Sequence, residues 1–341
     1  MKALLEQVLD GQDLRADQVS ALFNAMLAGE LDPSFIAGML VALRSKGESV
    51  TEIASAAKVM RAHAVAIPSP NGQVLVDTCG TGGDLSGTFN LSTAAAITVA
   101  TMGAKVAKHG NRSVSSKAGS ADVLEALGVK LGGTPGRLGA ILQEVGISFL
   151  FAPAHHASTR HAVGPRKALG VRTIFNLLGP LTNPAGAQRQ VLGVFAPEWV
   201  EPIAQVLKEL GSEHALVVHG HGGLDELSIS GPTQVAELRH GRVTLHQVTP
   251  EQVGLDRAGL GTLAGGSAQD NAEILRSIFK GERSPRADAV AYGAGAAAYV
   301  AGLHPSLEEG VQAARAVLHS GDVQGTLDGL VAASNAKESR C

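Results

Sequence analysis

The first 65 residues carry apolar side chains at helical spacing, so four helices are predicted there. The first two end at Gly11 and Gly29, and the third begins at Asp32-Pro33. The fourth opens with the capping box Ser49-Val-Thr-Glu52. The apolar stripes are narrow, which is typical of a helical subdomain or a dimer face. The sequence Pro68-Ser-Pro-Asn-Gly72 then ends the helical pattern and predicts a domain boundary.

From residue 74 short apolar strands alternate with helices, which predicts an α/β fold with a mostly parallel central sheet flanked by helices. Strands are expected at 74–76, 105–107, 147–151, 191–195, 215–218 and 227–229. Helices are expected at 93–102, 121–127, 135–145, 197–210, 269–279, 286–300, 306–319 and 323–334, with a hairpin around His240-Gly241. The predicted domains are a small all-helical one, residues 1–67, and a larger α/β one, residues 68–341.

The segment 155–184 departs from this alternation, because it is polar and basic at first and then rich in glycine and proline. It is long for a crossover between strands. We therefore expect the chain to leave the sheet, contact the helical domain around residues 160–188, and return. A segment shared by two domains is well placed to line a cleft between them.

The composition argues against several classes of protein. Of 341 residues 45% are hydrophobic and 17% charged, and the net charge of −3 gives no reason to expect a nucleic-acid or anionic-membrane surface. The N-terminus does not resemble a signal peptide, and no run of 18 apolar residues predicts a spanning helix. The two cysteines, Cys79 and Cys341, form no disulfide framework, which fits the reducing cytoplasm. We expect Cys79 to fill space beneath a loop.

A glycine-rich turn, Gly80-Thr-Gly-Gly-Asp84, directly follows the first predicted strand. Glycines allow a ligand to approach the backbone, and successive N–H groups can bind an anion. A tight turn without a ligand is the alternative. The turn fits neither a dinucleotide-binding fingerprint, since Leu85 stands where a glycine is needed, nor a Walker A loop, which needs Gly-Lys-Ser/Thr.

Two further polar stretches follow on the same edge of the predicted sheet, because parallel strands present their carboxyl ends together. Asn90-Leu-Ser-Thr93 opens a helix and is suited both to capping it and to binding phosphate or ribose. The segment from Lys108 to Lys117 interleaves cations with glycine and hydroxyls. Together these stretches predict a site for a ligand with more than one phosphate.

Polyphosphates usually bind with Mg²⁺, which prefers carboxylate oxygens. The pair Asp225-Glu226 is the best candidate, although acids flanked by glycines often only form a turn. His219 and His221 lack the further ligands that a zinc site needs. No Ser/His/Asp or Cys/His nucleophile arrangement is recognisable.

Five stretches in order, DTCGTGGD, TFNLSTA, KHGNRSVSSKAGSADVLEALG, GPRKALGVRTIFNLLGPLTNPA and the DEL of 225–227, resemble the anthranilate phosphoribosyltransferase family across essentially the whole chain. The resemblance implies the nucleoside-phosphorylase class II type fold and a homodimer formed through the helical domain. It also implies a reaction of tryptophan biosynthesis. The phosphoribosyl group of 5-phosphoribosyl 1-diphosphate passes to the amine of anthranilate, with Mg²⁺, expected as two ions.

The resemblance also assigns residues, position by position. For phosphoribosyl diphosphate it implies Gly80, Gly83, Asp84, Thr88, Asn90, Leu91, Ser92, Thr93, Lys108, His109, Gly110, Asn111, Arg112, Ser113, Val114, Ser115, Ser116 and Ser120. For anthranilate it implies Gly80, Asn111 and Arg166, with Arg166 facing the carboxylate and His109 and Pro180 nearby. For magnesium it implies Ser92, Asp225 and Glu226. No general base is assigned.

The sequence is also compatible with two rival functions. A pyrimidine nucleoside phosphorylase of the same fold would normally need a further C-terminal domain. A non-catalytic relative that binds nucleic acid is disfavoured by the near-neutral charge and by the intact Asp225-Glu226 pair.

Overall fold

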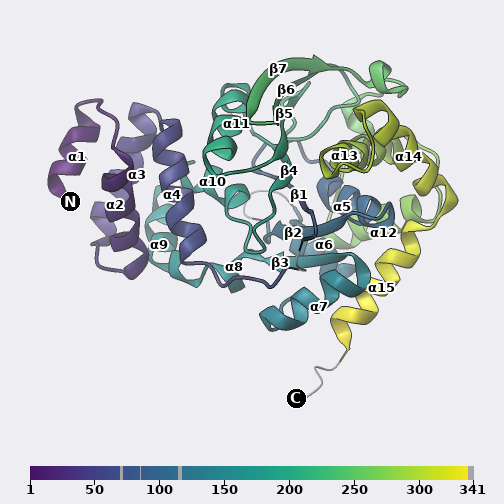
Figure 1. Ribbon diagram of the computed structural model, residues 1–341, viewed down its shortest axis with the longest axis horizontal. Helices are drawn as coiled ribbons and strands as arrows, with labels where there is room; N and C mark the ends of the chain where they lie inside the picture. The colour runs from purple at the N-terminus through teal and green to yellow at the C-terminus, as the bar shows by residue number, and fades with distance from the viewer. Residues whose placement is uncertain (70–71, 85, 114–116, 337–341) are drawn as a thin grey trace.

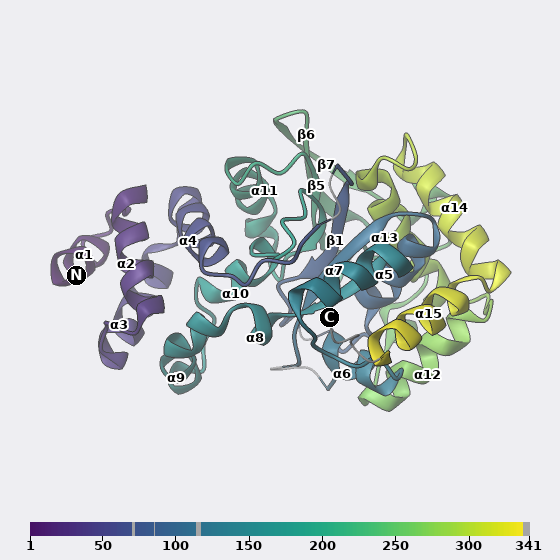
Figure 2. The same cartoon turned by 60° about the horizontal axis from the view of Figure 1, so that its bottom comes forward.

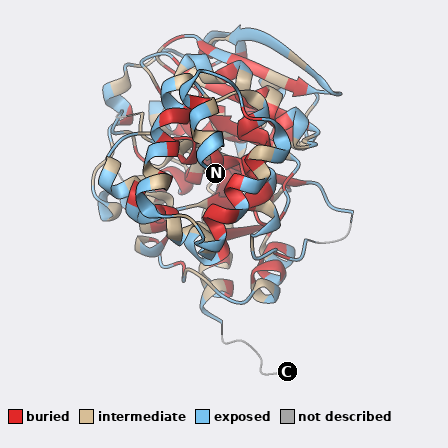
Figure 3. Cartoon of the chain, turned by 90° about the vertical axis from the view of Figure 1, so that its left-hand side faces the viewer, coloured by how far each residue is buried: buried red, intermediate tan, exposed pale blue. Residues whose placement is uncertain are grey.

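The computed structural model describes residues 1–69, 72–84, 86–113 and 117–336 (Figure 1). The chain begins with α1 (Lys2–Leu9), α2 (Ala16–Ala28), α3 (Pro33–Lys46) and α4 (Val50–Ala62), which lie together at one end of the molecule. The predicted caps are present: the Asp32 carboxylate accepts the Ser34 N–H at 2.7 Å, and Ser49 and Glu52 form a capping box. Figure 3 looks onto this end of the molecule and shows buried positions between the helices.

A seven-stranded sheet forms the centre of the described chain. Its strands are β1 (Leu75–Gly80), β2 (Lys105–Gly110), β3 (Ile147–Phe151), β4 (Arg189–Gly193), β5 (His214–Gly220), β6 (Thr233–Arg239) and β7 (Arg242–Val248). The order is β3-β2-β1-β4-β5-β6-β7; the first five strands are parallel, and β6 and β7 are antiparallel. The expected α/β fold is confirmed, and so is the hairpin at His240-Gly241. Both residues of its turn have positive φ values.

Helices cover both faces of this sheet. Their bounds are α5 (Leu91–Thr101), α6 (Ser120–Ala126), α7 (Pro135–Val145), α11 (Val200–Glu209), α12 (Ala268–Phe279), α13 (Pro285–Ala301), α14 (Leu307–Ser320) and α15 (Val323–Asn335). In β5 the side chains alternate: Leu216 and Val218 join the core with α5 and α13, whereas Ala215 and Val217 join the core with α4 and α11. Burial on both faces explains the continuous apolar strands.

The segment between β3 and β4 leaves the sheet and returns. It forms α8 (Ala152–His155), α9 (Arg160–Leu169) and α10 (Phe175–Leu178). Helix α9 packs against α2 and α3, and α10 packs against α4. Ala162 and Phe175 lie in the same core cluster as the apolar residues of α2 to α4. Figure 2 shows α8, α9 and α10 beneath the first helices, between them and the sheet.

Several strand predictions differ from the structure. Residues 227–229 form no strand; they belong to an irregular segment after β5, in which Leu227 and Ile229 are buried. In addition, β1 continues to Gly80 and β2 to Gly110, so residues expected in loops belong to the strand ends. Among the described helices, none is long and apolar enough to cross a membrane.

Candidate active site

Three glycines end three neighbouring strands: Gly80 in β1, Gly193 in β4 and Gly220 in β5. A Cβ atom on Gly193 would lie 1.6 Å from the Asp225 carbonyl oxygen, and one on Gly80 would lie 2.5 Å from Asp225 Oδ2. A Cβ atom on Gly220 would lie 2.4 Å from the Glu226 carbonyl oxygen. Side chains are therefore excluded at these strand ends, and their absence lets the acidic pair lie directly on the carboxyl edge of the sheet.

The glycine-rich turn after β1 is bound to the same acidic pair. The Gly82 N–H donates to Asp225 Oδ2 at 2.7 Å, and the Asp225 N–H lies 3.4 Å from Asp84 Oδ2. Gly82 and Gly83 have φ values of 68° and 75°, a backbone conformation that favours glycine. Thr81 fixes the start of the turn, because its hydroxyl accepts the Phe195 N–H at 2.9 Å.

Asp225 and Glu226 are acids held in an unfavourable environment. Desolvation, and then the nearby carboxylate of Asp84, raise the pKa of Asp225. Desolvation and the charge of Asp225 raise the pKa of Glu226. Glu226 Oε1 accepts the Ser92 N–H at the start of α5 at 3.1 Å. Crowded carboxylates whose charged forms are disfavoured are what a divalent cation would stabilise.

Lys108 lies beneath this cluster, with its side chain buried in the sheet. Its ammonium donates to the Thr78 carbonyl at 2.6 Å and lies 3.4 Å from Ser92 Oγ. Burial lowers its pKa, while the charge of Asp77 opposes that shift. The cation therefore supports the floor of the site, close to Ser92 and Glu226.

Sequence reasoning missed Asp77, a fully buried acid in β1. Its carboxylate accepts the His109 N–H at 3.2 Å and Asn183 Nδ2 at 2.8 Å. Burial raises its pKa to about 6, opposed by the charge of Lys108. Asp77 thus joins β1, β2 and the segment returning to β4. The signal available in the sequence was an acidic residue between the predicted strand at 74–76 and the glycine-rich turn.

The start of α5 is held by amide side chains. Asn90 Nδ2 donates to the Ala118 carbonyl at 3.2 Å, and Asn90 Oδ1 accepts Asn271 Nδ2 at 3.0 Å. Thr88 forms an isolated bridge with Ala264. Leu91 is buried, and the Thr93 hydroxyl is a buried group for which the described residues supply no hydrogen bond. This helix start therefore lies beside Glu226 but is tied to α12.

The basic segment after β2 is only partly described, because Val114, Ser115 and Ser116 lie outside the described residues. The Asn111 carbonyl accepts the Ser120 hydroxyl at 3.2 Å. The exposed Arg112 guanidinium contacts Asp122 at 2.9 Å and Glu125 at 2.6 Å, and these acids raise its pKa. Asp122 also accepts the Ser113 N–H at 3.1 Å. In this conformation Arg112 is paired with α6.

Arg166 projects from α9. Its guanidinium carbon lies 5.0 Å from the centre of the Phe175 ring, and partial burial lowers its pKa. Within the described parts of the chain no carboxylate forms an ion pair with it. A half-buried cation without an anionic partner is suited to bind a carboxylate ligand.

Two buried histidines connect β2 with the segment around α8. The rings of His109 and His156 lie edge to face, 5.2 Å apart. Burial, followed by the charges of neighbouring histidines, lowers the pKa of His109 to about 3. Burial and His155 lower the pKa of His156 to about 4. Both rings are therefore neutral near pH 7.

Other candidates lie apart from the acids. Cys79 contacts the Gln190 amide at 2.9 Å and lies near the Pro180 carbonyl, and burial raises the pKa of its thiol, which fits the space-filling role. His219 is bound to the Val194 carbonyl and His221 to Ser230, each at the ring Nδ1. In the described chain no group of three or more His, Cys, Asp or Glu side chains could hold a metal by itself.

Comparison with family models matches both parts of the chain. Residues 72–324 match the a/b domain of a glycosyl transferase family, and residues 2–64 match its helical bundle domain. Among curated proteins, an anthranilate phosphoribosyltransferase of Halorhodospira halophila is 49% identical over 97% of each chain. One from Symbiobacterium thermophilum is 51% identical over 96% of each chain.

Solved structures give the same result. Anthranilate phosphoribosyltransferase of Thermus thermophilus has a TM-score of 0.92 and 49% identity, covering 97% of this chain and 99% of that one. The Saccharomyces cerevisiae enzyme, in complex with PRPP and Mg, has a TM-score of 0.88 and 26% identity, covering 98% of each chain. The protein therefore belongs to this glycosyl transferase family and, within it, to the anthranilate phosphoribosyltransferases.

Proposed function

We propose that this protein transfers the phosphoribosyl group of 5-phosphoribosyl 1-diphosphate to the amine of anthranilate, releasing diphosphate. The observation that carries the proposal is the position of Asp225 and Glu226. They lie on the carboxyl edge of the sheet, bonded to the Gly82 N–H and the Ser92 N–H. Two acids with raised pKa values beside two anion-binding backbone segments suit a diphosphate bound together with a cation.

The acidic pair fits Mg²⁺ in kind and in number. Magnesium is typically held by one or two carboxylates together with substrate phosphates and waters, rather than by a protein cage. That preference agrees with two acids, Asp225 and Glu226, close to Ser92. When bound, the metal supplies positive charge to the leaving diphosphate.

We further propose two magnesium ions, because Asp225 is tied to the glycine-rich turn and Glu226 to the start of α5. Titration with Mn²⁺ in the presence of phosphoribosyl diphosphate, followed by electron paramagnetic resonance, counts the ions. Two ions bound per chain are expected, and saturation at one would contradict this part of the proposal.

The chain's own residues bind and orient the donor. In the described chain the backbone N–H groups of Gly83 and Asp84 have no hydrogen-bond partner, and they can donate to the phosphates as negative charge develops on the leaving group. Lys108 adds a fixed positive charge beneath them. Much of the catalysis is then electrostatic and positional.

Anthranilate, the acceptor, binds next to α9, where the Arg166 guanidinium has no carboxylate partner in the described chain. Anthranilate's neutral aromatic amine is a usable nucleophile without prior deprotonation. His109 and His156 are neutral and buried. No residue is assigned as the general base.

A fluorescence assay tests this function. Anthranilate fluorescence is followed with phosphoribosyl diphosphate and Mg²⁺, and then after the metal is removed with a chelator. We expect consumption of anthranilate that depends on both additions. Absence of turnover, with phosphorolysis of uridine or thymidine instead, would identify a nucleoside phosphorylase.

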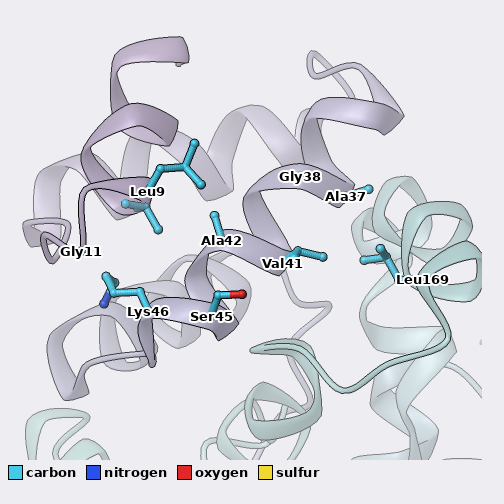
Figure 4. A pocket seen from close by; sticks show the side chains of 10 residues that line it. Leu9, Gly11, Ala37, Gly38, Val41, Ala42, Ser45, Lys46 and Leu169 are labelled. Carbon is cyan, nitrogen blue, oxygen red and sulfur yellow. The ribbon is translucent and has the colours of Figure 1, made fainter.

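We also propose that two copies associate through the helical domain, which comprises residues 1–67 and the segment around 160–188. A cavity of about 510 Å³ opens on this domain (Figure 4). It is lined by Val8, Leu9, Gly11, Ala37, Gly38, Val41, Ala42, Ser45, Lys46 and Leu169. Leu9 and Val41 are 67% and 39% exposed. Apolar surface of this kind favours association.

A further inference from the structure

Arg172 lies between α9 and α10 and bonds to two distant parts of the chain. Its guanidinium donates to the Gly83 carbonyl and stacks over the Phe195 ring, with its central carbon 4.3 Å from the ring centre. Its own carbonyl accepts Arg44 Nη1 from α3 at 2.6 Å. The residue thus joins the helical domain to the glycine-rich turn.

The bond to Gly83 has a directional consequence. Peptide groups are planar and trans, so a carbonyl and the following N–H point in opposite directions. Arg172 holds the Gly83 carbonyl, and the Asp84 N–H therefore points away from Arg172. On the preceding residue, Asp225 holds the Gly82 N–H at 2.7 Å. The turn is fixed from both sides, by the acidic pair and by Arg172.

Arg172 also lies six positions after Arg166 on the same segment. Helix α9 ends at Leu169, and Gly170 follows with a φ of 63°. Stacking on Phe195 fixes the plane of the guanidinium, and Arg44 fixes the backbone. A shift of the segment that carries Arg166 would therefore move the donor of the Gly83 bond.

We propose that Arg172 is a positioning residue that couples the two substrate sites. It fixes the glycine-rich turn that binds the donor when the segment carrying Arg166 is in place. This inference rests on the proposed transferase function. It concerns a residue that acts through Gly83.

The first test compares Arg172→Gln with Arg172→Lys. Glutamine removes the cation and the stacking, and we expect the KM for phosphoribosyl diphosphate to rise about tenfold or more. Lysine keeps a donor for the Gly83 carbonyl and should restore most of that loss. The matched control is Arg189→Gln at the amino-terminal end of β4, which removes bonds to the carbonyls of Val300 and Ala301. It should lower Tm but leave this KM within about twofold.

The second test measures coupling directly by calorimetry. The affinity for 4-fluoroanthranilate is determined with and without magnesium diphosphate, the leaving group. In the unchanged protein diphosphate should tighten this binding at least fivefold, and in Arg172→Gln the factor should fall to about one. An unchanged factor, or a KM effect no larger than that of Arg189→Gln, would overturn the proposal. If the unchanged protein shows no anthranilate turnover, the proposed function fails instead.

Discussion

At the scale of single residues, the site depends as much on absent side chains as on present ones. Gly80, Gly193 and Gly220 make room for the acidic pair on three adjacent strands. The sequence singled out Gly80 because it opens a glycine-rich turn. Gly193 and Gly220 gave no local signal, because only the folded sheet brings Asp225 and Glu226 against them.

Gly193→Ala should therefore impair metal binding. Its Cβ atom would lie 1.6 Å from the Asp225 carbonyl, so the acidic segment must move. Overpacking of this kind costs about 1–3 kcal/mol of stability. We expect the Mg²⁺ concentration for half-maximal activity to rise at least tenfold, measured by titration of the initial rate.

The control for this change is Gly136→Ala in α7, where the added Cβ has no neighbour within 4 Å. Alanine is the better helix former by about 1 kcal/mol, so this variant should be equally or more stable. Equal metal requirements in both variants would mean that Gly193 does not position Asp225.

Arg166→Ala should weaken acceptor binding selectively. A hydrogen bond to a charged group contributes about 1.5–3 kcal/mol, or roughly a 10- to 150-fold change in affinity. The KM for anthranilate should rise within this range, while that for phosphoribosyl diphosphate stays within about threefold. Lys167→Ala, an exposed neighbour on α9, is the control. Equal losses for both substrates would contradict the carboxylate role of Arg166.

At the scale of elements, the strands show what the pattern could and could not predict. Apolar runs located β3 and β5 well, and caps located α3, α4 and α7. The predicted strands ended too early at Val76 and Ala107, because the next residues, Asp77 and Lys108, have charged side chains that are more common in loops. These polar groups are compatible with buried strands because Asn183, the His109 N–H and the Thr78 carbonyl satisfy them. Such partners come from tertiary structure and cannot be inferred locally.

The strand predicted at 227–229 was wrong for a related reason. Leu227 and Ile229 flank Ser228, and this spacing predicts a strand equally well when the two apolar side chains only fill space within an irregular segment. The role of Arg172 was also invisible, because its partners Gly83 and Arg44 are distant in sequence.

The packing of β2 against the α8 segment predicts acid sensitivity. His109 and His156 titrate near 3 and 4 when folded, but near 6.5 when unfolded. Below about pH 6.5 the unfolded chain therefore binds more protons at these two histidines than the folded one, so their contribution to stability falls as pH decreases toward 4. The raised pKa values of Asp77, Asp225 and Glu226 act in the opposite direction, so the histidine contribution is measured as a difference between variants. Each histidine contributes up to about 1.4 kcal/mol of unfolding free energy per pH unit.

Urea unfolding between pH 7 and 4.5 measures this dependence. His156→Gln should reduce the slope by the share of one histidine, whereas replacement of His246, which is exposed on β7, should leave it unchanged. A slope that is the same in both variants would show that His156 is not held neutral.

At the scale of the whole molecule, the helical end carries exposed apolar residues beside a cavity, far from the β6–β7 end of the sheet (Figure 1). If two copies associate there, Val41→Glu places a charge in the interface. Light scattering coupled to size-exclusion chromatography should then change from about twice the chain mass to the single chain mass.

The matched control is Leu245→Glu on β7, which is 58% exposed. It should leave the mass unchanged. A single chain mass for the unchanged protein at micromolar concentration would contradict the dimer.

The proposed function depends on one arrangement: the donor lies across the carboxyl edge of the sheet, between the glycine-rich turn and the acidic pair. A crystal structure with phosphoribosyl diphosphate and Mg²⁺ tests it most directly. We expect magnesium at about 2.0–2.1 Å from carboxylate oxygens of Asp225 or Glu226, with the diphosphate against the turn at 80–84 and the ribose facing Arg166. A diphosphate bound away from the turn, or a metal held by other residues, would contradict it.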